Sequence, residues 1–236
     1  MAEIILSNRM QASTDMVTPG TVITDVGCDH GFVSVYLVQK GISPRVIAMD
    51  VRSGPLEHAR EHIREYGLED RIETRLSDGL HSLKTGEAAG MICAGMGGPL
   101  MEKILTEGRE QAKGFRELIL QPQSEIDKVR LYLLTHGYAI TGEKMVFEDG
   151  KYYPAMRAVH GEMPLWQDVE LQYGKYLLEE KHPVLQEYLK EKEKTCKKIQ
   201  EKLAADGKKA EKITARQKEL EDELRLIGQA LEVYER

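Results

Sequence analysis

Short apolar runs alternate with helix-like stretches along about the first 160 residues of the chain. The apolar positions over 32–41 and 54–66 predict helices, and Pro55 stands in the first turn of the second one. Strands that alternate with helices in this way predict an α/β fold with a doubly wound, mostly parallel sheet. The predicted strands of this sheet are residues 22–26, 45–50, 71–76, 90–94 and 117–121.

A different pattern follows the fifth predicted strand. Two apolar-rich runs, 138–147 and 152–159, are joined by Glu148-Asp149-Gly150-Lys151. Asp-Gly between strand-like runs is a strong signal for a tight β-hairpin turn, so we expect an antiparallel hairpin at the edge of the sheet. This layout is typical of the Rossmann-like class I methyltransferases that use S-adenosylmethionine (SAM), and it differs from an ordinary dinucleotide-binding domain.

Beyond Pro164 the sequence becomes long, charged and helix-forming. Its apolar residues recur in steps of three and four, which predicts the seam of a coiled coil. Ala205-Asp206-Gly207 interrupts the seam with poor helix formers, so we expect two helices folded into an antiparallel coiled-coil hairpin. The chain is therefore predicted to hold a sheet domain over 1–162 and a helical domain over 163–236. The predicted seam comprises Leu185, Leu189, Lys192, Cys196, Ile199, Leu203, Asp206, Ala210, Ile213, Gln217, Leu220, Leu224, Ile227, Leu231 and Tyr234.

Composition narrows the class of protein. The chain has 236 residues, of which 41% are hydrophobic, and its net charge is −6. It lacks the global basic signature of many nucleic-acid binders, although a local patch is enough for phosphate contacts. The three cysteines show no C-x-x-C spacing, which argues against a disulfide framework or a zinc site. With neither a secretory signal nor a membrane-spanning run, we expect a soluble, cytoplasmic protein without a metal.

The segment DVGCDHGF, residues 25–32, opens the helix that follows the first predicted strand. Its glycines let the backbone approach a ligand, and the helix N-terminus offers free N–H groups. By itself such a loop is weak evidence, because any strand-to-helix turn can carry two glycines. Asp29 stands where a Gly-x-Gly-x-Gly loop would have its middle glycine. The cofactor-binding residues predicted in this loop are Asp25, Gly27, Cys28, His30 and Gly31.

Acidic residues also follow the next two predicted strands. Asp50 ends the second strand, at the distance where a carboxylate accepts hydrogen bonds from both ribose hydroxyls of an adenosine-containing cofactor. Asp78 follows the third strand and could accept from the adenine amino group, although Asp-Gly is also favoured in turns. The fourth strand ends in CAGMGGPLM, at the edge of the sheet where open α/β folds bind ligands. These segments add Val51, Gly79, Ala94, Gly95 and Met96 to the predicted cofactor-binding residues.

The order of these motifs resembles that of one known family. DVGCDHGF, Asp50, LSDGL, AGMGG, LILQPQ and EDGKYY follow one another, and the chain opens with LSNRM and VTPG. Over about residues 6–160 this order resembles the bacterial TrmK family of tRNA (adenine-22-N1)-methyltransferases. There are two departures. The family usually continues its first loop as D-H-A-Y-L-P, and its hairpin strand commonly has Phe-Tyr-Glu where this chain has Tyr152-Tyr153-Pro154.

The resemblance implies a SAM-dependent enzyme that methylates N1 of adenine 22 in tRNA. In such an enzyme Asp29 would be the catalytic residue, either stabilising the charge that develops on the base or binding the ammonium group of the cofactor. His30 would be either a proton carrier or a buried support of the loop. Substrate contacts are expected from Gln121 and Pro122, and from Tyr152, which could stack on an extruded base.

The predicted helical hairpin carries local positive charge. Residues 187–218 hold eleven Lys or Arg against six Asp or Glu. Four of these lysines are spaced by four residues and share one helix face, which would suit the phosphate backbone of a tRNA. A solvated helix surface explains the same stripe nearly as well. The stripe consists of Lys190, Lys194, Lys198 and Lys202.

Two rival functions stay open at this stage. A SAM-dependent enzyme acting on a small molecule would use the helical hairpin for dimerisation or as a lid. A non-catalytic RNA-binding module would keep the fold without the chemistry. The primary prediction is a SAM-dependent tRNA methyltransferase that acts as a monomer.

Overall fold

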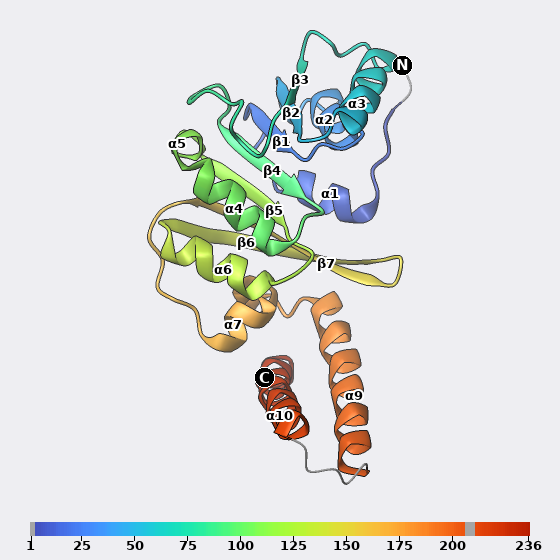
Figure 1. Cartoon of the computed structure of the whole chain (residues 1–236), viewed down its shortest axis with the longest axis vertical. Helices are drawn as coiled ribbons and strands as arrows, with labels where there is room; N and C mark the ends of the chain where they lie inside the picture. The colour runs from blue at the N-terminus through green and yellow to red at the C-terminus, as the bar shows by residue number, and fades with distance from the viewer. Residues whose placement is uncertain (1–2, 206–210) are drawn as a thin grey trace. The chain divides into compact units, whose positions relative to one another are not determined.

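A computed structural model describes residues 3–205 and 211–236, and their side chains other than those of 204–205 and 211–214. The chain divides into two compact units, Met1–Leu165 and Trp166–Arg236. The first unit is built on a seven-stranded sheet with the strand order β3-β2-β1-β4-β5-β7-β6 (Figure 1). Its strands are β1 (Ile23–Val26), β2 (Val46–Asp50), β3 (Ile72–Leu76), β4 (Gly90–Ala94), β5 (Glu117–Gln121), β6 (Tyr138–Glu148) and β7 (Lys151–His160).

Helices flank this sheet in the order α1 (Asn8–Thr14), α2 (Phe32–Gln39), α3 (Ser53–Glu65), α4 (Gly98–Glu107), α5 (Arg109–Ala112) and α6 (Ile126–Thr135). Strands β1 to β5 are parallel, and the chain moves outward from β1 to β3 before it returns to the centre and moves the other way from β4 to β5. Because such crossovers are right-handed, the reversal puts α2 and α3 on one face and α4 and α6 on the other. It also creates a crevice at the carboxyl ends of β1 and β4, where open α/β sheets bind ligands.

The central strands are buried on both faces. Every residue of β1, β2 and β5 is buried, as expected for a parallel sheet that helices cover on both sides. The predicted strands agree with the observed ones to within one residue at each end. The predicted helix 32–41 ends earlier, at Gln39, because the chain turns through Gly41 at a φ of 67°.

The edge hairpin has the geometry that its Asp-Gly turn predicts. β7 lies between β5 and β6 and is antiparallel to both. Asp149 and Gly150 have φ angles of 48° and 74°, so both central residues of the turn are left-handed, as a type I′ turn requires. The base of the hairpin is tied to α6 by a fully buried ion pair, in which Arg130 Nε donates to Glu143 Oε1 at 2.8 Å.

The second unit is helical. It contains α7 (Asp168–Tyr173), α8 (Lys175–Glu179), α9 (Pro183–Ala205) and α10 (Glu211–Glu235). Two contacts show that α9 and α10 are antiparallel: Tyr234 Oη donates to the His182 carbonyl, while Lys192 pairs with Glu223 at 2.8 Å. In the described part of the chain, no helix combines the length and the apolar run that a membrane crossing requires.

The predicted helical seam accounts for most of the packing between α9 and α10. Leu185, Leu189 and Cys196 of α9 and Leu220 and Ile227 of α10 are buried, and the other described seam residues are half-buried. The ammonium group of Lys192 lies over two aromatic rings, 5.8 Å from Tyr173 and 5.5 Å from Tyr188, so this polar seam position is stabilised by cation–π contacts. The predicted interruption at 205–207 and the seam positions Asp206, Ala210 and Ile213 fall outside the described side chains.

Candidate active site

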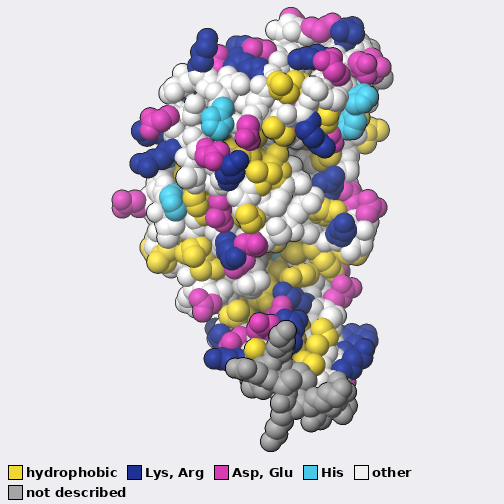
Figure 2. Space-filling view, viewed as in Figure 1, with side chains coloured by type: hydrophobic (Ala, Val, Ile, Leu, Met, Phe, Trp, Pro, Cys, Tyr) yellow, Lys and Arg dark blue, Asp and Glu magenta, His cyan; other side chains and the backbone are white. Residues whose placement is uncertain are grey.

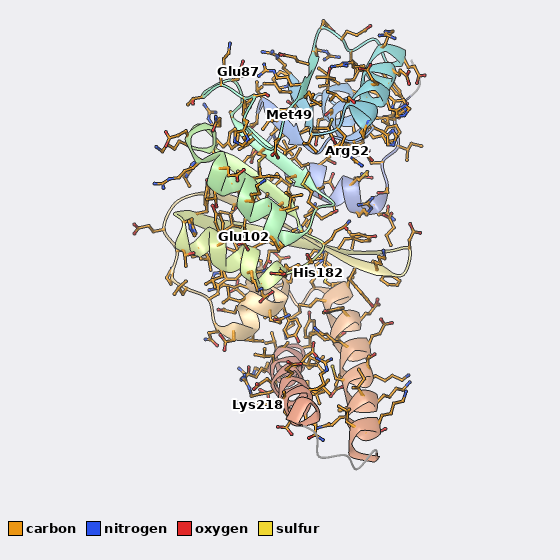
Figure 3. The ribbon with its side chains drawn as sticks, viewed as in Figure 1. Met49, Arg52, Glu87, Glu102, His182 and Lys218 are labelled. Carbon is orange, nitrogen blue, oxygen red and sulfur yellow. The ribbon has the colours of Figure 1, made fainter. Side chains whose placement is uncertain are left out.

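A pocket of about 450 Å³ opens at the carboxyl ends of β1, β2 and β4. It is walled by the loops that follow these strands and by Arg9 and Met10 of α1. Arg52, labelled in Figure 3, lies at the β2 side with its side chain 70% exposed. The pocket therefore lies in the crevice that the strand order predicts. Twelve residues predicted from the sequence line it: Asp25, Gly27, Cys28, Asp29, His30, Asp50, Val51, Asp78, Gly79, Ala94, Gly95 and Met96.

The loop between β1 and α2 is a tightly wound turn. Gly27, Asp29 and Gly31 all have positive φ angles, of 74°, 49° and 74°. Aspartate is one of the few residues besides glycine that visits this region readily, which explains how Asp29 replaces a loop glycine. The loop is held to β2 because the N–H groups of Gly27 and Cys28 both donate to the Met49 carbonyl, at 2.8 and 3.0 Å.

Gly31 has a packing role and does not line the pocket, contrary to the prediction that it binds cofactor. A Cβ atom at this position would lie 3.0 Å from the Cβ of Ala59 on α3, and its φ is left-handed. Glycine is needed here so that α2 and α3 can approach each other. Gly27 does face the pocket, where the Cε atom of Met96 occupies the space in front of it.

Asp50 organises the floor of the pocket. Its side chain is buried, and its two oxygens accept hydrogen bonds from the backbone N–H groups of Asp29 at 3.2 Å and Arg52 at 2.9 Å. One carboxylate thus links the β1 loop to the β2 loop. Val51, the next residue, is 61% exposed and offers an apolar surface beside it.

Asp25 lies in the wall of the pocket with almost no solvent contact. Burial raises the pKa of its carboxyl group to about 6, the hydrogen bond from Ser34 Oγ at 2.7 Å lowers it in part, and the negative charge of Asp50 raises it further. Burial also raises the pKa of the Cys28 thiol far above its ordinary value, and that of Cys93 to about 12. Neither thiol is a thiolate at neutral pH, so neither is a nucleophile.

Asp29 and His30 lie at the pocket mouth. The Asp29 side chain is 60% exposed and that of His30 is 44% exposed, with 3.8 Å between Asp29 Oδ1 and His30 Nε2. The imidazole of His30 is therefore not the buried support that was one of its two predicted roles. Its backbone carries that function instead, because the His30 carbonyl accepts a hydrogen bond from His62 Nδ1 at 2.9 Å.

The glycine-rich loop after β4 packs against the loop after β5. A Cβ atom on Gly98 would lie 2.6 Å from the Ser124 carbonyl oxygen, so only glycine fits there. Backbone hydrogen bonds run from Gly95 N to the Gln121 carbonyl and from Gln123 N to the Met96 carbonyl. The two loops are therefore joined into one wall of the pocket, and Gln123 is the residue of the second loop that reaches the cavity.

The structure corrects two of the predicted substrate contacts. The Gln121 side chain is fully buried, and its amide nitrogen donates to the Arg9 carbonyl at 2.7 Å and to Ser13 Oγ at 2.9 Å. It fastens α1 to the sheet and is not accessible to a substrate. Pro122, which is also buried, does not line the pocket. Tyr152 is half-buried outside the pocket lining, with its ring centroid 4.6 Å from that of Phe147.

Several pocket residues were not found from the sequence. Arg9 and Met10 come from a short helix whose docking site no local pattern indicates, although Arg9 lies within the LSNRM segment. The Arg9 side chain lies 3.7 Å from Glu148 and covers the ring of Tyr153 at 5.1 Å. The others lie within the quoted motif segments or within three residues of them in the chain. The remaining missed residues are Val26, Phe32, Val33, Arg52, Ser77, Leu100, Ile104 and Gln123.

These residues fit the chemistry of SAM. Asp50 would offer acceptor oxygens at the end of β2 to the ribose hydroxyls, and the exposed apolar side chains of Val51 and Leu100 in the pocket lining would contact the adenine ring. Asp25 and Asp29 would supply negative charge for the cationic sulfonium and ammonium groups. Among the described residues, no three His, Cys, Asp or Glu side chains are arranged to hold a metal ion.

We expect Asp25→Asn to stabilise the ligand-free protein at neutral pH. The folded-state pKa of about 6 lies above the ordinary value of 3.8, so the folded state binds the proton more tightly and loses stability as pH rises from about 4 to 6. Asparagine removes this cost of about 3 kcal/mol, which corresponds to roughly 6–12 °C in Tm. Thermal melts of both proteins between pH 4 and 8 measure the effect. A Tm difference that is the same at pH 4 and pH 7 would contradict it.

The sheet order, the antiparallel edge hairpin and this pocket define a class I SAM-dependent methyltransferase. In agreement, residues 6–156 match the family model described as a methyltransferase domain. The chain is 32% identical to the tRNA (adenine(22)-N(1))-methyltransferase of Bacillus subtilis (strain 168), over 98% of this chain and 99% of that protein. It belongs to this family of tRNA (adenine(22)-N(1))-methyltransferases.

Solved structures of similar proteins agree with this assignment. The crystal structure of the B. subtilis m1A22 tRNA methyltransferase TrmK is 29% identical, with a TM-score of 0.86 over 97% of this chain and 99% of that one. A putative tRNA (m1A22) methyltransferase from Streptococcus pneumoniae, solved in complex with S-adenosyl-L-methionine, is 28% identical, with a TM-score of 0.85 over 96% of this chain and all of that one.

Proposed function

We propose that this protein transfers the methyl group of SAM to N1 of adenine 22 in tRNA. The observation that carries the proposal is the pocket itself, in which a buried carboxylate at the end of β2, Asp50, accepts a hydrogen bond from the turn that presents Asp29. Similarity over the full length to the B. subtilis enzyme supports the same substrate. We further propose that the protein acts as a monomer in the cytoplasm, where tRNA is its partner.

Bound SAM supplies an electrophilic methyl group on a sulfonium centre. Adenine N1 has an in-plane lone pair, so the base attacks without first losing a proton and becomes cationic as the methyl group is transferred. A general base is therefore not required. The protein must instead hold the base in line and stabilise the positive charge that develops on it.

We assign this charge stabilisation to Asp29. Asp25 and Asp50 are buried in the wall and floor of the pocket and already accept hydrogen bonds from Ser34 and from backbone N–H groups. Asp29 carries the exposed carboxylate of the loop between β1 and α2. Its left-handed backbone conformation is held by the hydrogen bond from its own N–H to Asp50. A fixed turn that carries an exposed carboxylate at the pocket mouth can meet the ring of an extruded base without reorganising.

We propose that the second unit binds the tRNA backbone through one face of α9. Lys190, Lys194, Lys198 and Lys202 are all exposed there, and on the face shown in Figure 2 basic side chains gather over this helix. Their spacing of one helical turn resembles that of successive phosphates closely enough for several contacts at once. A solvated surface remains the rival explanation for the stripe, and salt dependence separates the two.

The test is methyl transfer from labelled SAM to unmodified tRNA, followed by digestion to nucleosides. We expect labelled 1-methyladenosine with a tRNA that has adenine at position 22, and none when that base is guanine. Absence of any tRNA product with retained SAM binding would support the non-catalytic module. The assay is then repeated at several salt concentrations with a variant in which all four stripe lysines are changed to glutamine. This variant should have a higher KM for tRNA, and its KM should depend less on salt. A KM equal to that of the parent would mean that the stripe is a solvated surface.

A further inference from the structure

The edge hairpin extends well beyond the rest of the sheet. β5 ends at Gln121, and its register with β7 places Leu120 opposite Met156, so Gln121 lies opposite Ala155. The four residues 151–154 and the turn therefore overhang the end of β5, by roughly 14 Å at the usual rise of a strand. Because β6 is antiparallel to β7 and thus runs in the same direction as β5, the turn lies at the carboxyl edge, which is the edge of the pocket. Figure 1 shows the tip projecting from the sheet.

One face of this overhang is joined to the pocket. Glu148 accepts a hydrogen bond from the Asn8 N–H at 2.7 Å and lies 3.7 Å from the guanidinium of Arg9, a pocket-lining residue. Arg9 also covers the ring of Tyr153. Successive side chains of a strand point to opposite faces. Phe147 and Tyr152, the neighbours of Glu148 and Tyr153, therefore point away from α1. The hairpin tip is therefore one side chain away from the pocket wall.

The opposite face of the overhang carries an aromatic pair, Phe147 and Tyr152. They are partners in the register of the hairpin, and their ring centroids are 4.6 Å apart. The next pair on this face toward the base, Met145 and Pro154, is buried, and Tyr152 is half-buried, so Phe147 is the first side chain of this face to be exposed. Phe147 is 47% exposed, which is unusual for so large an apolar side chain.

We propose that Phe147, backed by the ring of Tyr152, forms a platform on which a base next to the extruded adenine stacks. The inference rests on the proposed function. An adenine that enters the pocket leaves its neighbours in the tRNA without a stacking partner, and aromatic side chains are the usual replacement. The platform lies outside the pocket lining, so it suits a flanking base and not the target base.

The test compares Phe147→Ala and Phe147→Tyr with a control, Leu131→Ala, at a similarly exposed apolar position on α6. We expect Phe147→Ala to lower kcat/KM for tRNA by roughly 5- to 100-fold, the range for loss of one stacked base. SAM affinity, measured by calorimetry without tRNA, should not change. Phe147→Tyr should retain activity within about twofold of the parent, because it keeps the ring, and Leu131→Ala should also behave like the parent.

A second readout reports stacking directly. A tRNA with 2-aminopurine on one side or the other of adenine 22 should lose fluorescence when the parent protein binds it with S-adenosylhomocysteine, and Phe147→Ala should abolish that quenching. Equal kcat/KM and equal quenching in parent and Phe147→Ala would overturn the inference. So would a parent dimer that Phe147→Ala converts to a monomer, because the pair would then be a protein interface. A parent that makes no 1-methyladenosine would instead overturn the proposed function.

Discussion

Replacing Asp29 with asparagine is expected to slow methyl transfer to tRNA by about 100- to 1,000-fold, the usual effect of removing one electrostatic stabiliser from an active site. Asparagine keeps the size of the side chain and tolerates the φ angle of 49°, so the loop should keep its shape. The change removes only the negative charge of the side chain. Single-turnover transfer at saturating SAM measures the chemical step without product release.

The control for Asp29→Asn is Asp70→Asn, at an exposed acidic position in the turn before β3, which should leave the rate unchanged. SAM affinity separates the two roles of Asp29. A slow variant that binds SAM as tightly as the parent assigns the carboxylate to the base. A variant whose loss of rate is matched by a loss of SAM affinity assigns it to the ammonium group of the cofactor. Full activity in the variant would remove Asp29 from the mechanism.

The second large effect is expected on cofactor binding. Asp50→Ala should weaken SAM binding by at least about 100-fold, because it removes the acceptor oxygens for the ribose and charge-assisted hydrogen bonds contribute roughly 1.5–3 kcal/mol each. It also frees the N–H groups of Asp29 and Arg52 that the carboxylate holds, so the β1 loop loses an anchor. Calorimetric titration with SAM and with S-adenosylhomocysteine measures both affinities.

The two ligands should lose affinity by the same factor, since they share the ribose. Asp78→Ala is the matched comparison: its side chain is 59% exposed and paired only loosely with Lys103 at 3.8 Å, so its effect should be several-fold smaller. If Asp50→Ala bound SAM like the parent, the ribose would have to lie elsewhere. If Asp78→Ala had the larger effect, the adenosine would be held mainly from the β3 side.

The residues that the sequence located correctly belong to local patterns. Asp50 ends β2 and Asp78 comes shortly after β3, and in a parallel sheet the carboxyl ends of the strands meet at one edge. The turn at Asp149-Gly150 needs only its own φ angles to form. Gln121 shows the limit of this reasoning. It also ends a strand, the buried β5, yet its side chain is covered by α1, whose position depends on contacts more than 100 residues away in the chain.

The sequence by itself determined the strand and helix pattern, the hairpin turn and the acidic positions at the strand ends, because each follows from a period of two or 3.6 residues or from the backbone preference of one or two residues. Only the tertiary structure decided that Arg9 lines the pocket, that Gly31 serves helix packing, that Asp25 is buried enough for its pKa to rise, and that Phe147 is exposed near the hairpin tip. Burial and long-range contact are properties of the assembled core, and no local pattern encodes which segment covers which side chain.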